Sequence, residues 1–238
     1  MNGVRAIRSS LFLCIAVLVI GLLLFGCSAG RNAQLPTAEH PLRVACIGNS
    51  ITYGDGIQDR EHKSYPAQLQ TVLGPGWVVR NFGSSGRTLL RKGDYPYRNE
   101  KIFTDAKSFL PDIVIIKLGT NDSKPWNWKY KDEYVQDYID LVHEFEKLPS
   151  QPKVYVCTPV PAFPGNWGIT DSVIHLEVVP RVLLVAQATG VPVIDLYRAL
   201  TGRSDLFPDS VHPNEEGARL IAREVLKNIC PQCSKLPQ

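Results

Sequence analysis

Ile-Val-Ile-Ile-Lys-Leu-Gly-Thr-Asn-Asp, residues 113–122, combines the strongest strand signal of the chain with the polar turn that ends it. A short apolar run bounded by glycine is typical of a strand covered on both faces, as in a parallel sheet. Similar short runs lie at 44–47, 77–81, 154–157 and 193–194. Between and after them, helical spacing of apolar residues predicts helices at 65–73, 131–148, 172–189 and 215–229, with Pro180 starting or kinking part of the third.

Strands that alternate with helices predict a parallel sheet with helices on both of its faces. About five strands fit a flavodoxin-like three-layer α/β/α sandwich. Sites in such sheets lie outside the carboxyl ends of the strands, so the segments that follow the strands are the first to inspect. Three of these segments and one C-terminal loop are rich in small and polar residues: 48–52, 81–88, 118–122 and 207–214.

Each of these segments has an ordinary explanation when it is taken alone. Ser50 or Asn121 could cap a helix, and a lone histidine such as His212 is usually structural. Their order, and their position after successive strands, resembles that of the SGNH hydrolase family, also called GDSL-like acylhydrolases. The resemblance runs from about residue 43 to 229, and it departs from the family name at Asn49, where that name implies Asp.

The resemblance and the chemistry assign the same roles. Ser50 is the expected nucleophile, His212 its general base and later the acid, and Asp209 the group that holds the imidazole tautomer. Donors for the developing oxyanion would be the N–H groups of Ser50 and Gly86 and the side-chain amide of Asn121. Such a scheme needs no metal or other cofactor.

Two neighbouring residues compete for roles in this scheme. Gly83 is the alternative glycine donor, and Gly86 is preferred because it precedes a polar residue and a threonine, as in the family. Asp122 is expected to form structural hydrogen bonds. The His and Cys residues lack the spacing of metal ligands.

The loops favour a carbohydrate ester as the substrate. Trp126, Trp128 and Trp167 stand near asparagines, a pairing that suits sugar rings with apolar faces and hydroxyl edges, and Arg87 is a further candidate contact. The Gly-Asn-Ser-Ile-Thr stretch and the Trp-rich loop resemble bacterial sialate O-acetylesterase-type carbohydrate esterases. The expected reaction is therefore removal of O-acetyl groups from sugars such as sialic acid or a polysaccharide. A lysophospholipase or thioesterase, or a non-catalytic glycan-binding lipoprotein, stays as the alternative.

The N-terminal residues are expected to be a targeting segment outside the fold. Two arginines precede an apolar run at 11–25, which at 15 residues is short for a membrane span of about 20. The run ends in Leu-Phe-Gly-Cys-Ser, which resembles a bacterial lipobox with Cys27 as the acylated residue. The predicted organisation is a lipoprotein signal peptide (1–26), a tether (27–41), a hydrolase domain (42–230) and a tail (231–238), in an exported protein anchored to a membrane. An uncleaved signal anchor is the alternative.

The charge of the chain gives no indication of a nucleic-acid partner, and its cysteines do not form a disulfide-rich scaffold. The net charge of +3 falls to +1 without the two arginines of residues 1–26, and the remaining sequence has no Lys/Arg cluster that would indicate nucleic-acid binding. Cys46 and Cys157 lie in apolar runs and are expected to be buried thiols. Cys230 and Cys233 are expected to form a small local disulfide, with two free thiols as the alternative.

Overall fold

The central element of the fold is a parallel five-stranded sheet. The computed structural model describes residues 36–165 and 167–235. The strands run in the order β2-β1-β3-β4-β5, with every neighbouring pair parallel. Their bounds are β1 Leu42–Gly48, β2 Trp77–Gly83, β3 Ile113–Lys117, β4 Lys153–Cys157 and β5 Val193–Ile194. This is the flavodoxin-like strand order, and the predicted fold class is confirmed.

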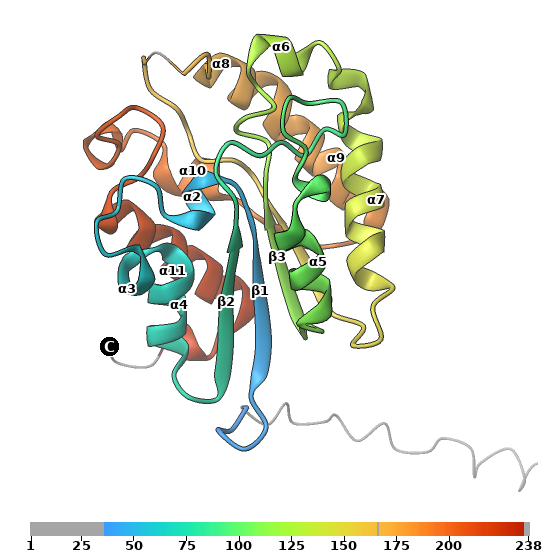
Figure 1. Cartoon of the computed structure of the whole chain (residues 1–238). Coiled ribbons are helices and arrows are strands. Elements are labelled where there is room, and N and C mark those ends of the chain that lie inside the picture. The colour runs from blue at the N-terminus through green and yellow to red at the C-terminus, as the bar shows by residue number, and fades with distance from the viewer. Residues whose placement is uncertain (1–35, 166, 236–238) are drawn as a thin grey trace, which may run out of the picture. The chain divides into compact units, whose positions relative to one another are not determined.

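Helices cover both faces of the sheet (Figure 1). One core cluster joins the sheet to helices that include α5 (Lys101–Ser108), α7 (Tyr134–Glu146) and α9 (Val179–Thr189). The other joins the opposite face to α4 (Tyr65–Leu73), α10 (Leu196–Leu200) and α11 (Glu215–Ile229).

The buried strand β3 shows why its sequence is apolar throughout. Ile113 and Ile115 belong to the cluster on the α11 side, whereas Val114 and Ile116 belong to the cluster on the α7 side. Alternate side chains of a strand point to opposite faces, so a strand covered twice needs apolar residues at every position. Lys117 is the exception, since it ends the strand fully buried.

The predicted helix at 172–189 is continuous but not uniform. It consists of a short α-helical turn, α8 (Asp171–Val173), a π-helical segment, η3 (Ile174–Val178), and α9. Pro180 lies in the first turn of α9 and has no N–H to donate, which accounts for the widened turn before it. By length and apolar composition this run of 19 residues could span a membrane, but Val178, Val182 and Val185 pack into the core.

Several short elements were not predicted from the sequence. They contain too few buried residues to show a helical period: α5 buries only Phe103 and Ala106. The other short elements that were not predicted are α2 (Ser50–Tyr53), α3 (Arg60–Lys63), α6 (Pro125–Trp128), α10 (Leu196–Leu200), η1 (Tyr97–Asn99), η4 (Ser204–Leu206) and η5 (Cys233–Lys235); the predicted helix at 131–148 begins with the 3-10 turn η2 (Lys131–Glu133).

The cysteines of the described residues behave as expected. Cys46 and Cys157 are free and buried, and burial raises the pKa of the Cys46 thiol to about 12. Cys230 and Cys233 form a disulfide directly after α11. The predicted signal peptide and Cys27 lie outside the described residues, as does most of the predicted tether.

Candidate active site

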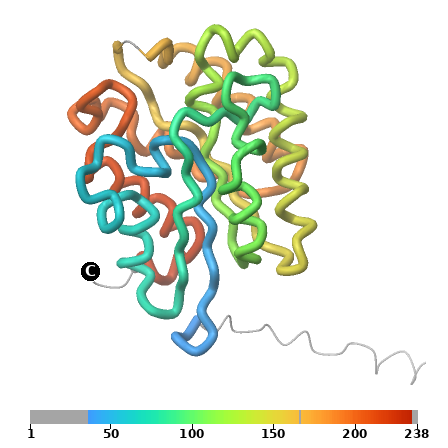
Figure 2. Tube along the Cα trace, in the orientation of Figure 1, coloured from blue at the N-terminus to red at the C-terminus, as the bar shows by residue number. Residues whose placement is uncertain are grey.

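The predicted site residues meet in a pocket at the carboxyl ends of the strands. The loops that follow β1, β2 and β3 gather at this end of the sheet together with the segment before α11 (Figure 2). The pocket has a volume of about 300 Å³. Its lining residues are Ser50, Asp55, Ser85, Gly86, Arg87, Tyr95, Asn121, Lys124, Trp167, Ile169, Val211 and His212.

Ser50 is held at the turn between β1 and α2. The strand ends at Gly48, and the helix begins at Ser50 with Asn49 as its N-cap. Asn49 is buried, and its Oδ1 accepts the N–H of Ile51 at 3.1 Å. An amide oxygen can accept this bond as a carboxylate oxygen would, so Asn in place of the family's Asp leaves the cap intact.

Ser50, His212 and Asp209 form a continuous hydrogen-bonded relay. His212 Nε2 lies 2.8 Å from Ser50 Oγ, and His212 Nδ1 lies 2.6 Å from Asp209 Oδ2. Because a carboxylate only accepts, Nδ1 carries the proton and Nε2 is left to receive the serine proton. This is the geometry that a serine nucleophile with a histidine base requires.

The turn that carries Asp209 and His212 fixes both side chains. Asp209 Oδ1 accepts the N–H groups of Val211 at 3.0 Å and His212 at 2.7 Å. Partial burial acts to raise the pKa of Asp209, but these N–H groups and the imidazole hold it below its usual value. The carboxylate therefore stays charged beside the imidazole.

Ser210 holds this turn in an unusual backbone conformation. Its φ of 75° lies in the left-handed region, which costs a non-glycine residue about 1–3 kcal/mol. Its Oγ donates to the carbonyl oxygen of Pro164 at 2.7 Å, and its own carbonyl accepts the N–H of Phe163 at 2.8 Å. The loop at 163–164 therefore braces the turn that presents the catalytic histidine.

Three donors border the position that a substrate oxyanion would take. The Asn121 amide nitrogen donates one hydrogen to the carbonyl oxygen of Arg87, at 3.1 Å, and its second hydrogen is free to donate to substrate. Among the described residues, no acceptor takes up the N–H of Ser50 or of Gly86. Gly86 adopts a φ of +80°, and a Cβ there would meet nothing within 4 Å. Its backbone conformation, and not lack of space for a side chain, accounts for the glycine.

The two competing candidates have structural positions. A Cβ on Gly83 would lie 2.2 Å from the backbone nitrogen of Tyr53, so Gly83 allows β2 to approach α2 closely. Asp122 is fully buried and accepts the N–H groups of Leu89 and Leu90 at 3.0 and 2.8 Å. Burial raises the pKa of Asp122 to about 6 against the effect of these bonds. Asp122 thus has the structural role expected of it, and it ties the loop after β2 to the loop after β3.

The four residues predicted to contact the substrate differ in their position relative to the pocket. Trp167 lines the pocket, with its ring edge-on to His212 at 5.6 Å between centroids and its indole N–H donating to the Asp209 carbonyl oxygen. Arg87 also lines the pocket, but its guanidinium is paired with Glu100 at 2.8 Å. Trp126 is 50% exposed outside the pocket lining.

Trp128 requires a correction. It is buried against Tyr134, and its indole N–H donates to Glu177 at 2.9 Å. This position in the core leaves no face of the ring for a sugar, so Trp128 is a packing residue.

Several lining residues had no signal in the sequence. Asp55, Tyr95 and Ile169 come from loops without a regular spacing of residues, and only the fold brings them together. Asn127 is a further support, because its buried amide donates to the carbonyl oxygen of Asn121 at 2.9 Å.

The comparison with protein families agrees with this geometry. The sequence model of the GDSL-like lipase/acylhydrolase family matches residues 46–220, a range that contains Ser50, Asn121, Asp209 and His212. The chain belongs to this family.

Curated relatives and solved structures extend the comparison. The chain is 47% identical over 209 residues to an acetylxylan esterase of Xylanibacter ruminicola, with 80% of this chain and 44% of that protein covered. It is 26% identical to a multidomain esterase of Ruminococcus flavefaciens, with 76% of this chain and 22% of that protein covered. The chain thus spans less than half the length of either relative. A solved carbohydrate acetylesterase from Sinorhizobium meliloti has the same fold, with a TM-score of 0.65 at 20% identity over 80% of this chain and 99% of that one.

Proposed function

We propose that this chain is a serine esterase that removes O-acetyl groups from carbohydrates, with acetylated xylan as the leading substrate. The Ser50–His212–Asp209 relay carries the proposal, because its two contacts of 2.8 and 2.6 Å open onto a pocket with three oxyanion donors. Family membership supports ester hydrolysis. The 47% identity to an acetylxylan esterase favours xylan over sialic acid as the sugar.

The first half of the reaction transfers the acetyl group to the enzyme. Ser50 Oγ attacks the acetyl carbonyl carbon while His212 Nε2 takes the hydroxyl proton. Negative charge then forms on the former carbonyl oxygen, where the N–H groups of Ser50 and Gly86 and the Asn121 amide stabilise it. Each such donor is typically worth about 2.7–4 kcal/mol of barrier. The C–O bond to the sugar breaks, and His212 donates its proton to the departing sugar oxygen.

The second half releases acetate. A water molecule gives a proton to His212 Nε2 and attacks the acetyl-serine carbonyl carbon, so the same donors act again. The serine oxygen leaves and recovers the proton from His212. Asp209 keeps its charge throughout and stabilises the imidazolium that forms in each half-reaction.

The length of the acyl group tests this proposal against a lipase-type alternative. A pocket shaped for a methyl group excludes longer acyl chains by overlap, because protein interiors are close-packed. A lysophospholipase or thioesterase would gain about 0.8 kcal/mol of binding for each buried CH₂. We therefore expect kcat/KM for p-nitrophenyl esters to fall steeply from acetate to butyrate and to vanish by octanoate.

The results of this assay distinguish the acetylesterase from the lipase-type and the non-catalytic alternatives. A rise in kcat/KM from acetate to octanoate would overturn the acetylesterase assignment and leave the Ser-His-Asp mechanism in place. A complete lack of activity on acetate esters, sugar acetates included, would favour the non-catalytic glycan-binding alternative. Acetylated xylo-oligosaccharides should be better substrates than O-acetylated sialic acid.

We also propose that the protein is exported and held at a membrane through acyl chains on Cys27. The support is the sequence alone: a basic start, a short apolar run and a lipobox-like Leu-Phe-Gly-Cys. Several acyl chains anchor a soluble domain stably, since each buried CH₂ contributes about 0.8 kcal/mol. Such a position would present the catalytic pocket to extracytoplasmic polysaccharide.

A further inference from the structure

The catalytic pocket is the first of three adjoining hollows. Asp55 lines this pocket, and the next residues along the chain, 56–59, line a second hollow of about 250 Å³. A Cβ on Gly56 would lie 3.8 Å from the Cβ of His212, so Gly56, which lines the second hollow, lies directly against the catalytic histidine. Lys63 and Glu215 line the second hollow and also a third one.

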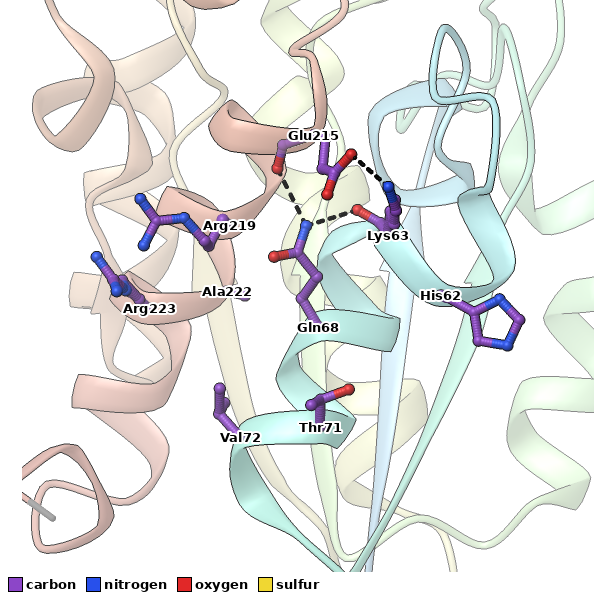
Figure 3. Close-up of a pocket in the computed structure, with 9 residues that line it drawn as sticks. All are labelled: His62, Lys63, Gln68, Thr71, Val72, Glu215, Arg219, Ala222 and Arg223. Carbon is purple, nitrogen blue, oxygen red and sulfur yellow. Dashed lines mark hydrogen bonds and ion pairs between the residues drawn. The ribbon is translucent and has the colours of Figure 1, made fainter. Parts of the chain in front are cut away.

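The third hollow is a groove of about 220 Å³ between α4 and α11 (Figure 3). Figure 1 places α3, α4 and α11 on the same side of the sheet, below the loops of the catalytic pocket. The groove is lined by His62, Lys63, Gln68, Thr71, Val72, Glu215, Arg219, Ala222 and Arg223.

We propose that the three hollows form one substrate track, in which the α4–α11 groove binds sugar units of the polysaccharide remote from the acetylated unit. This inference rests on the proposed carbohydrate esterase function and deepens it. The preferred substrate is then a glycan chain that extends beyond the catalytic pocket. The groove becomes a binding site although it takes no part in the chemistry.

The polar groups of the groove suit sugar hydroxyls. The Gln68 amide nitrogen donates to the carbonyl oxygens of Lys63 and Glu215, at 2.7 and 3.0 Å, and this fixes the side chain. Its amide oxygen points away from both bonds (Figure 3) and can accept from a hydroxyl. Arg219 and Arg223 follow each other on successive turns of α11 at the edge of the groove, and their side chains point away from Gln68 (Figure 3). The Arg219 guanidinium is paired with Glu216, and its Nε lies 2.7 Å from the carboxylate. A guanidinium has five N–H donors, so those not used by its protein partners can donate to sugar hydroxyls at this edge.

The shape of the groove suits more than one sugar ring. From Glu215 to Arg223 the helix advances about 12 Å, at about 1.5 Å for each residue. Val72, which is 39% exposed, adds apolar surface that the face of a sugar ring can cover, while Ala222 is buried beneath the groove.

The ion pair between Lys63 and Glu215 marks the boundary of the second and third hollows. Its atoms are 2.9 Å apart, and both side chains are about half exposed. Exposed pairs of this kind contribute at most about 1 kcal/mol, so a bound glycan can replace or bridge the contact at little cost. The boundary therefore does not close the track.

The test compares long and small substrates on the same enzyme variants. Thr71 is exposed on α4, so Thr71→Trp should fill the groove without disturbing the core, and Arg223→Gln should remove a charged donor. The measured quantity is kcat/KM for acetylated xylan divided by kcat/KM for p-nitrophenyl acetate. We expect Arg223→Gln to lower this ratio by about 2- to 10-fold, the effect of one hydrogen bond of 0.5–1.5 kcal/mol, mainly through KM. Thr71→Trp should lower it by at least a similar factor, because the indole occupies the space of a sugar unit.

Matched controls keep the result specific to the groove. Lys227→Gln removes a cation one turn beyond Arg223 on α11, outside the groove lining, and Gln187→Trp places an indole on exposed α9, on the other face of the sheet. Both controls should keep the wild-type ratio. An unchanged ratio in Thr71→Trp and Arg223→Gln, or equal kcat/KM for acetylated xylan and for acetylated xylose, would overturn the track. The proposed esterase function fails separately, if wild type does not hydrolyse p-nitrophenyl acetate.

Discussion

Lys117 gives the sharpest test of the folded structure, because it is a fully buried cation at the end of β3. It lies opposite Gly48 of β1, and its Nζ has no hydrogen-bond partner among the residues that the structure describes. Burial lowers the pKa of Lys117 from 10.5 to about 7, and Cys157 opposes this shift. We predict that Lys117→Met stabilises the protein most at neutral and lower pH.

The magnitude follows from proton linkage. Between about pH 7 and pH 10.5 the unfolded chain holds a proton on Lys117 that the folded protein lacks. The stability of wild type should therefore rise with pH across this window by about 1.4 kcal/mol per pH unit relative to Lys117→Met. Over the whole window from about pH 7 to pH 10.5 this rise amounts to roughly 5 kcal/mol. Below pH 7 both states are protonated, so the difference should be constant.

Urea unfolding followed by circular dichroism between pH 6 and 10 measures this difference. Lys147→Met is the matched control, because it makes the same replacement at a lysine that is exposed at the end of α7. Its stability relative to wild type should not follow the pH dependence expected of Lys117→Met. A pH-independent difference between wild type and Lys117→Met would refute the argument, since it would mean that Lys117 keeps its charge in the folded state.

Four further predictions concern the site and the anchor. Ser50→Ala should fold normally and lose at least about a thousandfold in kcat on p-nitrophenyl acetate; near-normal activity would remove Ser50 as the nucleophile. Asn121→Ala should lower kcat by about 10²–10³ with little change in KM, because its amide acts on charge that develops in the transition state; a change in KM alone would contradict this. In urea unfolding, Gly86→Ala should cost about 1–2 kcal/mol from backbone strain alone, and Gly83→Ala should cost more, because its Cβ would lie 2.2 Å from a backbone nitrogen; equal costs would count against the packing role of Gly83. Cys27→Ser should leave the membrane fraction or accumulate unprocessed, as fractionation and mass measurement would show; a processed, membrane-bound variant would contradict the lipobox interpretation.

Local features of the sequence were sufficient to predict the sheet and the relay. A short apolar run marks each buried strand, and the alternation of strands with helices predicts a parallel sheet. Asp209 and His212 lie three residues apart, so one turn of chain brings the carboxylate to the imidazole. Ser50 follows its strand directly, where the fold class places active sites. These conclusions depend on neighbours in the chain, which a sequence displays.

Exposure of single side chains, in contrast, was decided by tertiary packing. Trp126 and Trp128 are two residues apart and looked equivalent, yet one is half exposed and the other is buried against Tyr134. Lys117 resembles a polar residue that ends a strand at the surface, but the folded protein buries it completely.

The sequence by itself determined the fold class, the nucleophile and its base, because strand periodicity, turn chemistry and motif spacing are local properties. Only the tertiary structure decided which loop residues share the catalytic pocket, that Gly86 is needed for its backbone conformation, and that α4 and α11 leave a groove between them. The physical reason is that burial and cavity shape arise from contacts between residues far apart in the chain, such as Gln68 with Glu215, and no local pattern specifies those contacts.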